Sequence, residues 1–367
     1  ESAGSRGPSQ ATLLVQIAKD LYEFGHTTAG EALAVPSGGP LIARPFVGGR
    51  SALRAELSLR FYQEYGKASN TAALASALNV LQGCALSGPV WNPGLRVAQH
   101  KSDIVFDLGR PDGKVVRING SGWSIQNTPV LFRRTQLSGE MPIPERDGNL
   151  ELLRRLINVP DDLWPIVVGY LVSLLFPNIP HAILALTGEQ GTGKSTLARL
   201  LVELFDAGPA PLRTAPRDVE QWCVQAAGSW VVALDNISNI RFWLSDALCR
   251  ASTGDGLVRR QLFTDSDLSV VNFRRCVILT SIDPGALRGD LADRLLLIEL
   301  NRIPTEERKL DAYLIASFHS YRPQLMGALF NLASGVIREL PDVQLQSYPR
   351  MADFAKVLAA LDRVTGW

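Results

Sequence analysis

Apolar side chains recur at helical spacing in three early segments of the chain. The segments are 10–24, 51–66 and 70–82, and a loop rich in proline and glycine, 34–49, follows the first. From about Val90 the period changes to two, which predicts short strands. These strands are expected at 96–99, 104–108, 115–118 and 122–125.

Helices followed by a β-meander predict a small α+β domain. We expect this N-terminal domain to span residues 10–145, after a small, polar and disordered segment at 1–9. A linker rich in proline and glycine, 142–148, ends it. Lys101, Arg133 and Arg134 lie in this domain, to which we assign DNA contact or oligomer assembly.

The second half of the chain alternates apolar strands with helices. Strands are predicted at 182–186, 230–234 and 276–280, and this rhythm is typical of a mostly parallel sheet in an α/β domain over 149–303. A helical segment, 304–367, completes the chain. Its helices are predicted at 305–319, 323–339 and 351–363, and two more, at 149–157 and 161–176, precede the first of the strands.

Composition narrows the class of protein. A net charge of +1 leaves no global charge excess to indicate a nucleic-acid or membrane partner, so any such surface is local. The longest apolar run, 163–176, is shorter than the roughly 20 residues that span a bilayer and contains Pro165. Because the first residues lack an apolar signal segment, we expect a cytoplasmic protein that is not bound to a membrane.

A glycine-rich segment lies between the predicted strand at 182–186 and a predicted helix at 196–205. It reads Gly188, Glu189, Gln190, Gly191, Thr192, Gly193, Lys194, Ser195 and then Thr196, which fits the P-loop pattern G-x-x-x-x-G-K-[ST]. In such a loop backbone N–H groups surround phosphate, Lys194 reaches the terminal phosphates, and Ser195 ligates Mg²⁺. The alternative is a chance glycine-rich turn, which the flanking strand and helix disfavour. We therefore predict ATP and Mg²⁺ as cofactors.

A second motif supports the first. The strand at 230–234 ends in Asp235, as in a Walker B motif, whose aspartate holds the Mg²⁺ shell. The next residue is Asn236, which cannot accept a proton, where most hydrolytic relatives place a glutamate. Hydrolysis is therefore slow or uses another carboxylate, such as Glu189 or Glu220.

With these motifs, residues 180–300 resemble the ATPases of AAA+-like superfamily 3 helicases, and more closely those of phage and integrative-element replication proteins. The likeness extends to the segments 252–260, 273–281 and 290–300. It implies a γ-phosphate sensor at Thr280 or Ser281.

The same resemblance implies an arginine finger at Arg294. Such an arginine reaches the ATP of a neighbouring subunit, which implies a ring, expected to be a hexamer. The alternative is that Arg294 pairs with Asp290 or Asp293 on its own helix.

Residues 252–272 are predicted to form a β-hairpin. In the family that resembles this chain, such a hairpin grips the nucleic-acid backbone. Its candidates here are Arg259, Arg260, Arg274 and Arg275, since a guanidinium group can bind phosphate with two parallel hydrogen bonds. For Arg274 and Arg275, an ordinary solvated hairpin with intersubunit salt bridges is an equal alternative.

These motifs together predict an ATPase that acts as a DNA helicase of a phage or mobile-element replication system. Its substrate is single-stranded or forked DNA. The alternative is an ATP-binding switch or assembly scaffold that oligomerises without moving along DNA, which Asn236 favours. We find no clustered acidic residues that would indicate a nuclease or primase site.

Overall fold

The computed structural model describes residues 7–48, 52–255, 257–260, 268–271, 273–281 and 289–367. These residues form two compact units. The first holds the chain up to Gly94 together with Asn127–Thr135, and the second holds Leu95–Gln126 and Gln136–Trp367. The predicted domain 10–145 is thus divided, with its helices in the first unit and its β-meander in the second. Most of the predicted disordered segment 1–9 lies outside the described residues.

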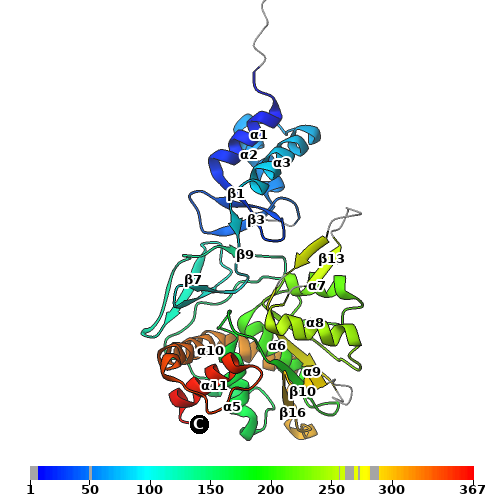
Figure 1. Cartoon of the computed structure of the whole chain (residues 1–367). Helices are drawn as coiled ribbons and strands as arrows, with labels where there is room; N and C mark the ends of the chain where they lie inside the picture. The colour runs from blue at the N-terminus through cyan, green and yellow to red at the C-terminus, as the bar shows by residue number, and fades with distance from the viewer. Residues whose placement is uncertain (1–6, 49–51, 256, 261–267, 272, 282–288) are drawn as a thin grey trace, which may run out of the picture. The chain divides into compact units, whose positions relative to one another are not determined.

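The first unit is a mixed five-stranded sheet with three helices (Figure 1). The strand order is β4-β1-β2-β3-β9, in which β1, β2 and β3 pair antiparallel and the two edge strands pair parallel. The elements are α1 (Gln10–Leu21), β1 (Tyr22–Thr27), β2 (Ala32–Pro36), β3 (Ile42–Pro45), α2 (Leu53–Tyr65), α3 (Thr71–Leu86), β4 (Val90–Trp91) and β9 (Phe132–Arg133).

The β2 strand shows why this sheet is hard to see in the sequence. Its side chains alternate between faces, with Ala32 and Ala34 in the core under the helices and Leu33 and Val35 in a second cluster. Because both faces are buried, the strand lacks the alternation of apolar and polar residues. It therefore lies, with β3, where a loop was predicted.

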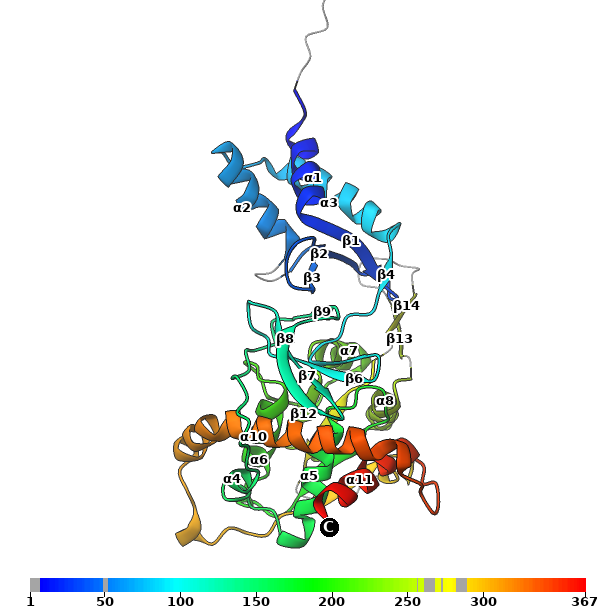
Figure 2. The same cartoon turned by 90° about the vertical axis from the view of Figure 1, so that its left-hand side faces the viewer.

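A four-stranded antiparallel meander begins the second unit. It consists of β5 (Val97–His100), β6 (Asp103–Asp107), β7 (Lys114–Asn119) and β8 (Gly122–Asn127), close to the predicted strands. The meander lies against α10 (Asp311–Glu339), as Figure 2 shows. The ring of Phe330 on this helix packs against Phe106 at 5.3 Å and Trp123 at 5.9 Å, between ring centroids.

A parallel five-stranded sheet forms the centre of the second unit. Its order is β11-β12-β15-β10-β16, and every adjacent pair runs parallel, so the predicted α/β class with a parallel sheet is confirmed. The strands are β10 (Ile183–Thr187), β11 (Leu212–Arg213), β12 (Val231–Leu234), β15 (Cys276–Thr280) and β16 (Leu295–Glu299).

Helices cover both faces of the parallel sheet. Leu184 and Leu186 of β10 join the core that contains α5 and α6, whereas Ile183 joins the core that contains α7 and α8. All residues of β10 are buried, as expected of a central parallel strand. The helices are α4 (Glu151–Arg154), α5 (Trp164–Ser173), α6 (Lys194–Phe205), α7 (Val219–Ala227), α8 (Phe242–Thr253) and α9 (Gly289–Ala292).

The C-terminal segment is helical, as predicted, but differs in detail. One helix, α10, runs through Pro323 where two helices were predicted, and α11 (Ala352–Thr365) follows it. Burial of Phe318, Leu325 and Phe330 on either side of the proline holds the helix continuous. Within the described residues, no helix has the length and apolar character needed to cross a membrane.

Candidate nucleotide site

The glycine-rich loop joins β10 to α6 and needs its glycines. Gly188, Gly191 and Gly193 have φ angles of 138°, 83° and 83°, which side chains disfavour. A Cβ atom on Gly188 would lie 2.6 Å from the carbonyl oxygen of Leu300. Consecutive turns of this kind form concave nests of backbone N–H groups, and α6 begins directly after them at Lys194.

The Lys194 ammonium group lies within this loop. Its Nζ donates to the carbonyl oxygens of Gly188 and Glu189, each at 2.7 Å, and to Thr192 Oγ1 at 3.3 Å. Desolvation lowers the pKa of Lys194, and the charge of Asp235 opposes this shift. The amine is therefore held at the start of the helix, close to the Asp235 carboxylate.

Three side chains from separate elements meet at the carboxyl edge of the sheet. Ser195 lies in the first turn of α6, Asp235 follows β12, and Thr280 ends β15. Ser195 Oγ donates to Asp235 Oδ1 at 2.7 Å, and Thr280 Oγ1 donates to the same oxygen at 2.6 Å. A carboxylate beside a hydroxyl supplies the hard oxygen ligands that Mg²⁺ prefers.

Asn236 adopts a left-handed conformation beside this group. Its φ is 56°, and its N–H donates to Thr280 Oγ1 at 2.8 Å. Asparagine tolerates this region better than most residues. Ser281, the other candidate sensor, donates from Oγ to the carbonyl oxygen of Ile237 at 2.6 Å. Thr280 is thus the candidate sensor that contacts Asp235.

A cavity of about 350 Å³ adjoins the glycine-rich loop. Gly191, Gly193, Thr196 and Leu197 form one side of it. The other lining residues come from segments far away in the sequence: Arg155, Leu156, Ile157, Asn158, Ile303, Glu307, Arg308, Lys309, Asp311 and Leu314. No motif in the sequence indicated these residues, because they meet only in the folded chain.

Two polar side chains join this cavity to the loop. Asn158 Nδ2 donates to the carbonyl oxygens of Thr192 at 3.1 Å and Asn301 at 2.5 Å. An Arg308 Nη2 atom lies 3.0 Å from the position a Cβ on Gly191 would occupy. A guanidinium group therefore lies against the loop from within the same chain.

Arg294 lies at the opposite edge of the sheet. It precedes β16, and its carbonyl oxygen accepts from the N–H of Ile183 at the start of β10, whereas the glycine-rich loop follows the end of β10. Its Nε is 3.9 Å from Asp290 Oδ2, so the alternative ion pair is loose. Arg350, which the sequence did not indicate, pairs with both Asp290 and Asp293.

The four arginines predicted to bind nucleic acid fall into two groups. Arg259 and Arg260 lie on β13 (Leu257–Arg260), which pairs antiparallel with β14 (Leu268–Val271) as a hairpin. Their side chains, and the connecting residues 261–267, lie outside the described part of the chain.

Arg274 and Arg275 donate hydrogen bonds within the chain. Arg274 Nη2 bonds the carbonyl oxygen of Thr253 at 2.9 Å and its Nη1 that of Pro177 at 3.1 Å, while Arg275 Nε bonds that of Ala226 at 2.5 Å. Thr253 is the last residue of α8 and Ala226 the next-to-last residue of α7, and a positive charge at the C-terminus of a helix interacts favourably with the helix dipole.

Solved structures resemble the fold at low sequence identity. The C-terminal region of NrS-1 in its A form matches with a TM-score of 0.50 and 12% identity, covering 96% of this chain and 72% of that one. A structure described as the active helicase Cch of SCCmec type IV matches with a TM-score of 0.47 and 14% identity, covering 94% and 70%. No curated protein sequence matches the chain.

A family model matches more than half of the sequence. It describes the actinomycete integrative conjugative element replication protein and covers residues 150–367, which include the glycine-rich loop, Asp235, Thr280 and Arg294. The chain therefore belongs to the family of actinomycete integrative conjugative element replication proteins.

Proposed function

We propose that this replication protein is an AAA+-like P-loop ATPase, related to the superfamily 3 helicases, that works as an oligomeric motor on DNA. The convergence of Ser195 Oγ and Thr280 Oγ1 on Asp235 Oδ1, beside Lys194 and the glycine-rich loop, carries the proposal. These groups fit a magnesium-bound phosphate chain, because they combine hard oxygen ligands, a cation and a helix N-terminus.

The adjoining cavity suits the base and ribose of the nucleotide. Leu156, Ile157 and Ile303 give it apolar walls, and Asn158 adds a fixed amide. The Arg308 guanidinium against Gly191 places positive charge beside the loop that would hold the phosphates. A site of this kind would contact the base, the ribose and the phosphates of ATP.

The position of each side chain in the candidate site suggests its role in ATP turnover. Lys194 offsets charge on the terminal phosphates, and bound Mg²⁺ would neutralise charge that develops during phosphoryl transfer. Thr280, on the strand between the P-loop strand and the Asp235 strand, links the phosphate end of the site to Asp235. Asn236 cannot take a proton, so Glu189 in the loop or Glu220 in α7 would act as the base.

Arg294 lies at the edge of the sheet opposite its own glycine-rich loop, which supports a role in a neighbouring subunit's site. We propose a ring, of hexameric size, in which Arg294 completes each site between subunits. The β13–β14 hairpin with Arg259 and Arg260 would contact single-stranded or forked DNA in the cytoplasm.

A second candidate function is an ATP-binding switch or assembly scaffold. Asn236 favours it, because this side chain cannot act as a general base. The bonds of Arg274 and Arg275 to backbone carbonyls also reduce the set of arginines available to DNA.

ATP hydrolysis with and without forked DNA distinguishes the two candidates. We expect DNA to stimulate turnover, Lys194→Ala to abolish it, and Arg294→Ala mixed into wild type to inhibit more than dilution does. Lys67→Ala, on the surface of the first unit, is the matched control. ATP binding with no turnover and no response to DNA would rule out the motor and leave the switch.

A further inference from the structure

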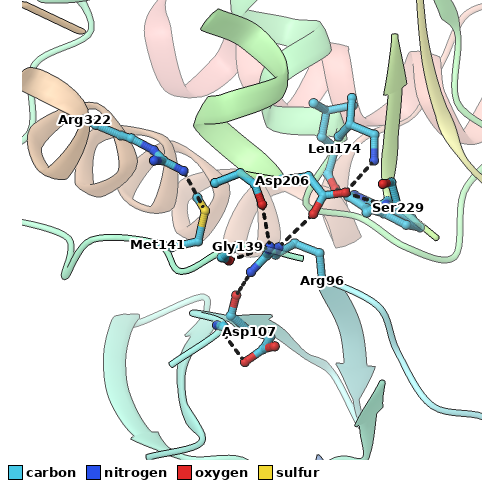
Figure 3. A network of polar contacts seen from close by, with 12 residues as sticks. Arg96, Asp107, Gly139, Met141, Leu174, Asp206, Ser229 and Arg322 are labelled. Atoms are coloured by element: carbon cyan, nitrogen blue, oxygen red, sulfur yellow. Dashed lines mark hydrogen bonds and ion pairs between the residues drawn. The ribbon is translucent and has the colours of Figure 1, made fainter. Parts of the chain in front are cut away.

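A buried arginine joins three segments of the second unit (Figure 3). Arg96, which directly precedes β5, donates from Nε to Asp206 Oδ1 at 3.1 Å, from Nη1 to the carbonyl oxygen of Asp107 at 3.0 Å, and from Nη2 to that of Gly139 at 3.0 Å. The side chains of Arg96 and Asp206 are 1% and 5% exposed. The guanidinium group is therefore held rigidly from several directions.

Asp206 connects α6 to β12. It directly follows the last residue of α6, and its Oδ2 accepts from the N–H of Trp230 at 2.6 Å and the N–H of Val231 at 3.2 Å. Trp230 immediately precedes β12 and Val231 begins it. One carboxylate thus fixes the end of the helix against the start of the strand, and Arg96 fixes that carboxylate.

The opposite ends of the same two elements carry the nucleotide site. Ser195, in the first turn of α6, donates to Asp235, which follows β12, at 2.7 Å. A helix rises 1.5 Å per residue and transmits a displacement along its axis with little compression. A shift of α6 against β12 at the Asp206 end would therefore change the spacing between Ser195 and Asp235.

Stability alone does not account for this pair. Removing two charges from water is costly, and well-packed apolar residues stabilise a core as well or better. A charged pair with fixed donors does hold a defined geometry. We propose that Arg96, acting through Asp206, is a positioning residue that sets the spacing of Ser195 and Asp235 and thereby the affinity for the magnesium form of the nucleotide. The inference rests on the proposed nucleotide function.

The test compares nucleotide affinity with Mg²⁺ and with EDTA, using a fluorescent ADP analogue and the full chain. Arg96→Lys keeps the charge but lacks the planar set of donors, and Asp206→Asn keeps an acceptor for Trp230 N–H but loses the charge. Mg²⁺ should raise the affinity of wild type for the nucleotide. In both variants we expect this increase, measured as the ratio of affinity with Mg²⁺ to affinity in EDTA, to be roughly tenfold smaller, as it is for changes next to metal ligands. Affinity in EDTA should stay within about twofold of wild type.

Arg117→Lys is the matched control, because Arg117 pairs with Asp103 inside the meander and should leave both affinities unchanged. Circular dichroism confirms folding, and Asp206→Asn carries the test if Arg96→Lys does not fold. An unchanged gain from Mg²⁺, or an equal loss of affinity with Mg²⁺ and with EDTA, would overturn the positioning role. Failure of wild type to bind nucleotide in either condition would instead overturn the proposed function.

Discussion

Thr280 has two hydrogen bonds that place it at the centre of the candidate site. Its hydroxyl donates to Asp235 Oδ1 and accepts from the N–H of Asn236. Ser281, the neighbouring candidate, bonds the carbonyl oxygen of Ile237 instead. The structure thus separates two residues that the sequence left as alternatives, because only the pairing of β12 with β15 decides which hydroxyl reaches Asp235.

Thr280→Val should slow ATP turnover by about tenfold or more, since it removes one contact to Asp235 and leaves the Asn236 N–H unpaired. Ser281→Ala should change turnover by less than about twofold. Steady-state kinetics of both variants provide the measurement. Equal losses, or a larger loss for Ser281→Ala, would contradict the assignment of Thr280.

His181 predicts a pH dependence of stability. His181 lies directly before Ala182 and is fully buried. Among the described residues, neither nitrogen of its ring has a hydrogen-bond partner. Desolvation, assisted by the charge of Arg274, lowers the pKa of His181 to about 3 from 6.5. The folded protein therefore keeps the ring neutral at a pH where the unfolded chain protonates it.

This difference in pKa between the folded and unfolded chain sets the direction in which stability changes with pH. Stability is full above pH 6.5 and falls as the pH drops toward 3, because only the unfolded chain gains the proton. At pH 5 the loss is about 2 kcal/mol. Urea titrations at pH 7.5 and pH 5 measure this loss. The free energy of unfolding should fall between these two pH values by about 2 kcal/mol less in His181→Leu than in wild type. The same loss in both proteins would contradict the assignment.

At the scale of elements, two helical glycines lie in opposite surroundings. A Cβ atom on Gly327 of α10 would lie 1.6 Å from the carbonyl oxygen of Glu145, whereas a Cβ on Gly83 of α3 would meet nothing within 4 Å. The segment before α4 therefore packs backbone to backbone against α10, and only glycine permits this approach.

Alanine at these two positions should have opposite effects. Gly327→Ala should destabilise by about 1–3 kcal/mol or more, because the backbone of Glu145 cannot move aside as a flexible side chain can. Gly83→Ala should stabilise by about 0.5–1 kcal/mol, because alanine loses less conformational freedom in a helix. Urea unfolding followed by circular dichroism measures both. Effects of the same sign would be inconsistent with this packing.

Local patterns predicted some elements better than others. The strands β10, β12 and β15 agree with the sequence because each is an apolar run bounded by turn signals. Strands β2 and β3 were missed because proline and glycine surround them and tertiary contacts decide their pairing. The proline in α10 predicted a break that burial on both sides prevents.

At the scale of the whole molecule, the candidate site divides into a local part and a distant part. The glycine-rich loop and Asp235 were predictable, because each belongs to a motif of consecutive residues. Asn158, Arg308 and the Arg96–Asp206 pair were not, since their partners lie far away in the sequence. The family model, which begins at residue 150, covers the candidate nucleotide site but not the first unit.

The proposed function requires ATP and Mg²⁺ to bind at the glycine-rich loop that precedes α6. The decisive measurement is the ATP affinity of wild type, Lys194→Ala and the control Lys67→Ala, each with Mg²⁺ and with EDTA. We expect Mg²⁺ to strengthen ATP binding to wild type and to Lys67→Ala alike. The Lys194→Ala substitution should weaken ATP binding by about tenfold or more. Equal affinity of Lys194→Ala and wild type, or no binding to wild type, would contradict the nucleotide site.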